Sequence, residues 1–202
     1  MARLSSAQRR VQLVDAAIRV MTREGIAKAT TRAIVAEAGV SLSVFHYCFE
    51  SKQELFEAVI ATLTEHSASP AMAAADLGPD ATLRDTVRAS LQAYWDHVVA
   101  NPDEHMLTYE LTQYVLRQPG LEDVAHRQYR QYVKANRDVV EQVQKQFGFE
   151  LSISVSDLAR YLASTLDGLT LNYLVLGNKA SAERILDALS DQVVTYVRAT
   201  RA

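Results

Sequence analysis

The most constraining feature of this chain is the tetrapeptide Ala38-Gly39-Val40-Ser41, which separates two short helical segments. Thr30 or Thr31 can cap the first segment, over about 31–38, and Ser41 can cap the second, over about 42–48. A tight turn between helices needs a residue that tolerates a positive φ just beyond the first helix, and Gly39 is such a residue. Two short helices joined in this way are typical of a helix-turn-helix.

Hydrophobic periodicity predicts a longer helix on each side of this pair. Ser5 and Gln8 have capping-box spacing, and apolar residues follow them at helical spacing until Gly25. Ser51 and Glu54 repeat the capping-box spacing before the fourth helix. That helix carries Leu55, Phe56, Val59, Ile60 and Leu63. The first 55 residues therefore predict a compact helical lobe.

The rest of the chain also predicts helices. Pro70, Gly78 and Pro79 lie among small residues between Ala68 and Asp80, and we interpret this segment as a break between lobes, although its alanines could also extend the fourth helix. Further helices are expected over about 81–100, 103–117, 121–147, 156–176 and 180–199.

Few turn-forming residues interrupt these segments. The 202 residues include seven Gly and four Pro, which leaves little room for the many turns of an all-β fold, and strand alternation is confined to the fragment Glu150–Val155. We expect an all-α protein of about nine helices. An N-terminal three-helix helix-turn-helix domain, 1–55, would be joined to a larger helical domain, 56–202, for effector binding and dimerisation.

Charge is distributed unevenly along the chain. Residues 1–55 carry eight Lys or Arg against five Asp or Glu, a net charge of +3, whereas the remainder has a net charge of −6. A basic N-terminal segment followed by an acidic remainder suggests that a polyanion binds near the N-terminus. The single cysteine, Cys48, excludes an internal disulfide and fits a reducing compartment. Without an apolar segment of about 20 residues, we expect a cytoplasmic protein.

The residues around the turn resemble a known signature. Residues 30–41 (TTRAIVAEAGVS) and 45–55 (FHYCFESKQEL) are similar to the DNA-binding signature of the tetracycline-repressor (TetR) family, and the likeness extends over about 10–57. Residue types and spacings match together, which makes the signature specific. The resemblance implies an all-helical regulator that binds double-stranded operator DNA, and repression is the commoner mode in this family.

The resemblance also implies roles for individual residues. The recognition helix would be Leu42–Cys48, whose outward-facing residues would begin at Ser41. Its base-edge contacts would be Leu42, Ser43 and Val44. Phosphates would lie near Thr31, Arg32, His46, Tyr47 and Lys52. Many family members have Lys-Gly at positions 42 and 43 and Tyr at position 46, so the apolar Leu42 shifts the expected base contacts toward apolar groups such as thymine methyls.

A cluster of aromatic and polar residues predicts an effector site in the second domain. Such sites are mostly apolar with a few polar groups. The candidate ligand-binding residues are Trp95, Tyr109, Glu110, Gln113 and Asn172. A buried Glu110 would favour a cationic ligand or would be protonated, whereas the remaining residues favour a small, largely hydrophobic effector. The competing interpretation is that these aromatic residues simply fill the core.

The last two predicted helices are apolar on two sides. Leu158, Leu162, Leu166, Leu169 and Tyr173 form one stripe, with Leu171 and Leu174 outside it. Ile185, Leu189, Val193 and Tyr196 form another, with Leu186 and Val197 outside it. A helix that is apolar on two sides needs partners on both, and in the TetR family the last two helices form a dimer interface. We therefore expect a homodimer through residues 156–199.

Other functional classes have little support in the sequence. We find no nucleophile elbow, phosphate-binding glycine loop or zinc-protease motif, so we predict no enzymatic activity and no cofactor. Glu122 and His126 are four residues apart, but exposed charged pairs at this spacing are common, and we predict no metal site. The remaining alternative is a helical protein-interaction module without DNA binding.

Overall fold

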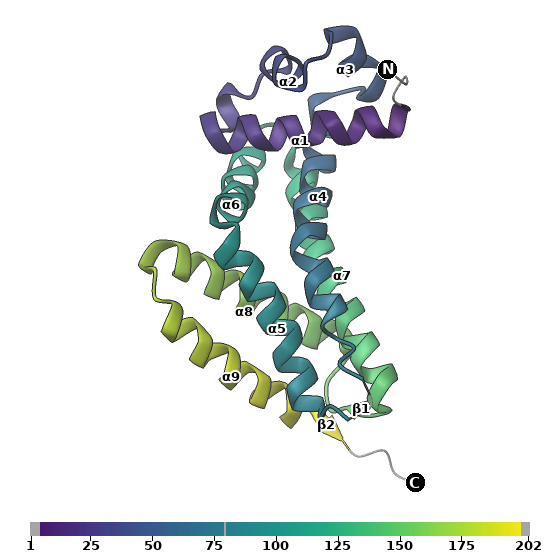
Figure 1. Ribbon diagram of the computed structural model, residues 1–202, viewed down its shortest axis with the longest axis vertical. Coiled ribbons are helices and arrows are strands. Elements are labelled where there is room, and N and C mark those ends of the chain that lie inside the picture. The colour runs from purple at the N-terminus through teal and green to yellow at the C-terminus, as the bar shows by residue number, and fades with distance from the viewer. Residues whose placement is uncertain (1–4, 79, 199–202) are drawn as a thin grey trace. The chain divides into compact units, whose positions relative to one another are not determined.

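The computed structural model describes residues 5–78 and 80–198. This described part contains nine α-helices, one 3₁₀-helix and two short strands (Figure 1). In chain order they are α1 (Ser6–Glu24), η1 (Ile26–Lys28), α2 (Thr31–Ala38), α3 (Leu42–Cys48), α4 (Lys52–Ala73), α5 (Leu83–Ala100), α6 (Pro102–Leu116), α7 (Glu122–Phe147), β1 (Glu150–Leu151), α8 (Val155–Leu176), α9 (Lys179–Thr195) and β2 (Val197–Arg198). The all-α fold with an N-terminal helix-turn-helix is confirmed.

The chain forms two compact units. Unit 1 contains Met1–Leu63 and Asp103–Tyr129, and unit 2 contains Thr64–Pro102 and Arg130–Ala202. Helices α4 and α7 therefore contribute residues to both units, whereas α6 beyond Pro102 belongs with the helix-turn-helix. The predicted domains, by contrast, are two continuous stretches of sequence.

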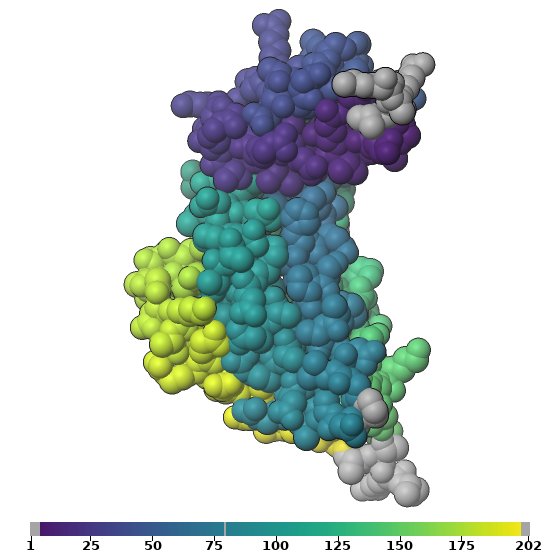
Figure 2. Space-filling model, viewed as in Figure 1, coloured from purple at the N-terminus to yellow at the C-terminus, as the bar shows by residue number. Residues whose placement is uncertain are grey.

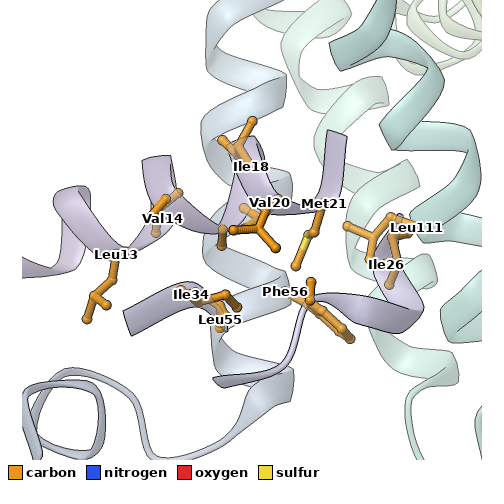
Figure 3. Packing of buried hydrophobic residues seen from close by; sticks show 14 of the residues in the cluster. Leu13, Val14, Ile18, Val20, Met21, Ile26, Ile34, Leu55, Phe56 and Leu111 are labelled. Atoms are coloured by element: carbon orange, nitrogen blue, oxygen red, sulfur yellow. The ribbon is translucent and has the colours of Figure 1, made fainter. Parts of the chain in front are cut away.

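Unit 1 is organised around the apolar face of α1. Figure 3 shows side chains from α1, η1, α2, α4 and α6 converging on one core. Leu13, Ile34, Leu55, Phe56 and Leu111 each have no solvent-exposed area in this cluster. Because fully burying a large apolar side chain contributes roughly 2 kcal/mol, these contacts supply the stability that short helices such as α2 and α3 lack on their own.

The turn between α2 and α3 has the conformation that the sequence predicts. Gly39 adopts φ 65° and ψ 35°, in the left-handed region that glycine tolerates best. Its backbone N–H donates to the carbonyl of Ala36 at 3.1 Å, and that of Val40 donates to the carbonyl of Val35 at 3.0 Å. Thr30, rather than Thr31, caps α2 by accepting a hydrogen bond from the backbone N–H of Ala33. The turn thus directs α3 away from the axis of α2.

Unit 2 packs α5, α8 and α9 around a second apolar core that includes Trp95, Leu158, Leu166, Leu186 and Leu189. A row of ion pairs joins α5 to α9 alongside this core. Arg84 contacts Asp191 at 2.6 Å. Arg88 contacts Asp187 at 2.6 Å and Glu183 at 2.9 Å, and the Arg88 guanidinium lowers the pKa of Asp187.

Several helix ends differ from the sequence expectations. Helix α4 continues through Pro70 to Ala73, so the alternative in which the alanines extend this helix is the correct one. Helix α9 ends at Thr195, after which β2 pairs antiparallel with β1 through Leu151 and Val197. Pro79 and Ala199, which the sequence places in a loop and at a helix end, lie outside the described residues.

Candidate nucleic-acid interface

The predicted recognition residues lie on the outer surface of unit 1. Residues 31–48, in the blue range of the colour bar, form part of this surface in the space-filling view (Figure 2). The side chains of Phe45, Cys48 and Phe49 point into the core. Those of Arg32, Ser41, Leu42, Ser43, His46 and Tyr47 are exposed, and those of Thr31 and Val44 are half-buried. Leu42, Ser43, His46 and Tyr47 thus face outward as the sequence predicts, whereas Val44, a predicted base-edge contact, packs partly against the core of unit 1.

Two exposed apolar groups stand out on this surface. Leu42 is 41% exposed and Tyr47 is 75% exposed. The hydroxyls of Ser41 and Ser43 lie 2.7 Å apart at the start of α3, beside Leu42. Apolar groups next to hydroxyls match the mixture of methyl groups and hydrogen-bonding edges in the major groove. The arrangement therefore fits contact with base edges.

Several of the basic side chains near this surface are already paired with carboxylates. Arg19 and Arg23 of α1 both contact Glu37 of α2, at 2.8 and 3.1 Å. These two hydrogen bonds, that of Arg19 above all, lower the pKa of Glu37 and keep it charged. Lys28 and Arg32 are exposed and make no ion pair with any described residue. Their charges are available to phosphate groups.

Lys52 has a different environment. Its ammonium lies 5.1 Å from the ring centre of Phe56 and 5.7 Å from that of Tyr114 on α6. Both distances are within the range of cation–π attraction. Partial burial lowers the pKa of Lys52. Because the side chain is half-buried at the start of α4, it must extend from these rings to reach a phosphate.

Helix α1 supports the helix-turn-helix at two points that the sequence analysis missed. The amide of Gln12 donates to the carbonyl of Ala38 at 2.8 Å, immediately before the turn. Arg10 donates to the carbonyl of Cys48 at the end of α3 and to Glu54 of α4. These contacts join residues at least 26 positions apart, and no periodicity relates such positions. The basic residues of α1 are the only sequence signal that could have drawn attention to Arg10.

The candidate ligand-binding residues fall into two groups. Trp95 is fully buried in α5 and Tyr109 is half-buried in α6. Glu110, Gln113 and Asn172 have exposed side chains. Because the Glu110 carboxylate is exposed, it does not require a cationic ligand in this conformation. Their roles in ligand binding stay predictions.

Two family models match the chain. The model "Bacterial regulatory proteins, tetR family" matches residues 13–59. The model "BetI-type transcriptional repressor, C-terminal" matches residues 79–198, which is more than half of the chain. The chain belongs to the TetR family. It is a DNA-binding transcriptional regulator and not an enzyme, and the alternative of an interaction module without DNA binding is set aside.

Relatives of known name or structure agree with this family. The chain is 29% identical over 196 residues to the HTH-type nicotine-responsive transcriptional repressor HdnoR of Paenarthrobacter nicotinovorans, covering 95% of this chain and 98% of the relative. A TetR-family regulator from Rhodococcus sp. matches with a TM-score of 0.75 at 21% identity, covering 93% and 98% of the two chains. The multidrug binding protein EbrR, solved with imidazole, matches with a TM-score of 0.64 at 24% identity, covering 96% and 97%.

TetR-family regulators bind operator DNA and small-molecule effectors and form dimers. Within residues 5–78 and 80–198, every helix is too short or too polar to span a bilayer. Glu122 and His126, the pair with possible metal-ligand spacing, are both exposed. Nδ1 of His126 lies 3.6 Å from Oδ1 of Asp123, which is also exposed.

We predict that Lys52→Ala weakens binding to every DNA sequence to a similar degree. Loss of one phosphate contact should flatten the dependence of log affinity on log salt by about one unit per bound chain. The measurement is a set of binding isotherms at several salt concentrations on two unrelated duplexes.

Lys145→Ala is the matched control, because it removes an equal charge from an exposed position of α7 in unit 2. This control should leave the salt slope unchanged. An unaltered slope for Lys52→Ala, with native helix content, would show that Lys52 stays on its aromatic rings in the DNA complex.

Proposed function

We propose that this regulator is a cytoplasmic repressor whose operator binding is relieved by a small, mostly apolar nitrogen heterocycle. The observation that carries the proposal is the indole N–H of Trp95. Trp95 has no exposed area, and its Nε1 atom has no hydrogen-bond partner in the described part of the chain. An unsatisfied buried donor costs about 1–3 kcal/mol, and a ligand with a hydrogen-bond acceptor would recover that free energy.

The surroundings of Trp95 favour an uncharged ligand. Its ring packs edge to face on Tyr173 of α8, with centroids 4.8 Å apart. The other buried hydrophobic residues of the unit 2 core are aliphatic, and Tyr94 and Tyr196 pack against them. The fully buried polar residues of this unit, among those described, are Thr86, Ser90, Thr170 and Ser190, none of which carries a charge. Burial also raises the pKa of Tyr94, whose hydroxyl pairs with Thr170, and keeps this phenol neutral.

The descriptions of two similar proteins support a nitrogen heterocycle as the effector. One relative is nicotine-responsive and one structural neighbour was solved with imidazole. Both molecules contain an aromatic ring nitrogen whose lone pair accepts a hydrogen bond. This chain offers the complementary donor in Trp95. Glu110, Gln113 and Asn172 are exposed, so we place the anchor of the effector at Trp95, within unit 2.

Release from DNA follows from linkage. An effector that binds one conformation of the regulator more tightly lowers the population of the other by the difference in its two affinities. If the conformation that accommodates a ligand at Trp95 differs from the one that matches both operator half-sites, the effector must weaken DNA binding. Equal affinity for both conformations would change nothing.

The proposal includes a homodimer formed by α8 and α9. Large apolar side chains of these two helices are exposed: Leu171 is 43%, Val175 70%, Leu176 66% and Ile185 41% exposed. Such a set of exposed side chains marks an interaction surface. Leu189, in contrast, is 4% exposed and belongs to the core of unit 2. A two-fold axis through this face would match a palindromic operator.

The effector hypothesis predicts a dependence on the ring nitrogen. Pyridine- or imidazole-type ligands should quench Trp95, the only tryptophan, and release the operator duplex. Carbocyclic analogues of the same shape should need about fivefold higher concentrations, since one hydrogen bond contributes about 1 kcal/mol. The measurement is fluorescence titration together with a DNA-release assay.

Trp95→Phe should abolish this preference in the release assay, because phenylalanine has no N–H. Tyr94→Phe is the control: it removes a different polar atom from the same helix and should keep the preference. If carbocyclic and heterocyclic ligands release the operator equally well from the native protein, the assignment of Trp95 as the anchor fails.

The dimer hypothesis predicts that Val175→Glu produces monomers. A carboxylate at this position would be buried without a partner in the dimer, at a cost of several kcal/mol, but it would face solvent in the single chain. Sedimentation should show monomers with native helix content, and operator affinity should fall because two linked half-site contacts become one.

Leu77→Glu is the matched control, because Leu77 is 47% exposed but lies outside α8 and α9. It should sediment like the native protein. A native protein that is monomeric at micromolar concentration would contradict the proposed interface.

A further inference from the structure

The C-terminal end of α3 is held by a single side chain of α1. Nη1 of Arg10 donates to the carbonyl oxygen of Cys48 and to Oε1 of Glu54 at 2.7 Å. The guanidinium carbon of Arg10 also lies 4.3 Å from the ring centre of Phe49. The other carboxylate oxygen of Glu54 accepts the backbone N–H of Glu50 at 2.8 Å. One guanidinium thus contacts three consecutive parts of the chain: the last residue of α3, its C-cap and the first turn of α4.

Helix α3 needs such support because it is short. It has seven residues, and an isolated helix of this length is not stable in water. Its last carbonyls have no partners within the helix, and its C-terminus carries partial negative charge. Arg10 provides both a hydrogen-bond donor and a positive charge at this point. The only basic residue in the last turn of α3 itself is His46, whose side chain is exposed.

The stacked ring adds a geometric constraint. Phe49 is 1% exposed, adopts an extended conformation, and packs against Phe45 with ring centroids 5.6 Å apart. The guanidinium of Arg10 lies over the ring of Phe49 while binding the carbonyl of Cys48. The end of α3 can therefore rotate or shift only if the stacking or the hydrogen bond is lost.

We propose that Arg10 is a positioning residue for operator reading, which holds α3 in the orientation that matches base edges. The inference rests on the DNA-binding function and on α3 as the recognition helix. Base-edge contacts require accurate placement of α3, whereas phosphate contacts tolerate small shifts. Loss of Arg10 should therefore lower affinity for the operator more than affinity for unrelated DNA. Arg10 lies outside residues 13–59, which match the helix-turn-helix family model.

Arg10→Met and Arg9→Met form a matched pair of variants. Both remove one positive charge from adjacent positions of α1, but the Arg9 guanidinium donates to the side-chain oxygen of Gln12 in the same helix and, among the described residues, forms no hydrogen bond or ion pair with α3. Affinities are measured at one salt concentration for the full chain, on the duplex that the native protein selects from a randomised pool and on a scrambled duplex of equal length. Arg10→Met should lower the ratio of the two affinities by about tenfold, the effect of losing one good base contact. Arg9→Met should leave the ratio unchanged.

Cys48 provides a second readout. It is the only cysteine in the chain and is 5% exposed, at the residue whose carbonyl Arg10 binds. Reaction with a coloured aromatic disulfide reagent should be several-fold faster in Arg10→Met than in the native protein or Arg9→Met, because the end of α3 opens more often. Helix content and thermal unfolding are recorded for each variant, since global unfolding would abolish binding to both duplexes.

The possible results distinguish failure of the role proposed for Arg10 from failure of sequence-specific DNA binding. A lower affinity ratio with faster labelling and a native melting transition supports Arg10 as a positioning residue. An unchanged ratio in Arg10→Met overturns it. If Arg10→Met does not fold, Arg10→Lys retains the charge but not the planar stacking, and an unchanged ratio in that variant overturns the inference equally. Equal affinity of the native protein for selected and scrambled DNA would instead contradict sequence-specific binding itself.

Discussion

The orientation of the recognition helix α3 depends on the burial of one face of α1. Helices α2 and α3 have eight and seven residues, too few to keep a helical conformation in water without tertiary contacts. Their inward side chains share a core with α1 in which Leu13 and Ile34 have no exposed area. Polar contacts then fix the details: Gln12 binds the carbonyl before the turn, and Arg10 binds the carbonyl at the end of α3. The core supplies stability, and these two side chains supply orientation.

Unit 2 combines two kinds of surface in the same helices. The buried stripes of α8 and α9 form its own core, while Val175 and Leu176 remain exposed. Ion pairs from Arg84 and Arg88 fix α9 against α5, which also carries Trp95. The helix proposed to bind the effector is therefore directly connected to one of the helices proposed to form the dimer. A change around Trp95 has a physical route to the dimer face through these contacts.

The sequence predicted the features that depend on local chemistry. The positive φ of Gly39, the capping box at Ser5 and the outward direction of Leu42 and Tyr47 follow from residue type and spacing, and the structure confirms them. The ambiguity at Pro70 could not be resolved in this way. A proline inside a helix costs about 3 kcal/mol, yet α4 continues past it, and Ala74 donates to the carbonyl of Pro70 at 3.0 Å.

Contacts between residues far apart in the sequence could not be predicted from spacing. Nothing in the spacing relates Arg10 to Cys48, 38 residues away, or places Lys52 over Tyr114. Periodicity also shows that α9 is apolar on two sides without showing which side is internal. The sequence pattern groups Ile185 with Leu189, whereas the structure exposes Ile185 and buries Leu186 beside Leu189. A difference of one position is a rotation of about 100° on a helix, and tertiary packing decides it.

Base preference shows whether the outward side chains of α3 contact base edges. Selection from a randomised duplex pool should be carried out in parallel with the native protein and with Leu42→Ala, whose side chain is exposed and does not support the core. If Leu42 contacts a base edge, preference should change at one or two positions in each half-site and stay the same elsewhere. An identical preference profile for both proteins would contradict such a contact.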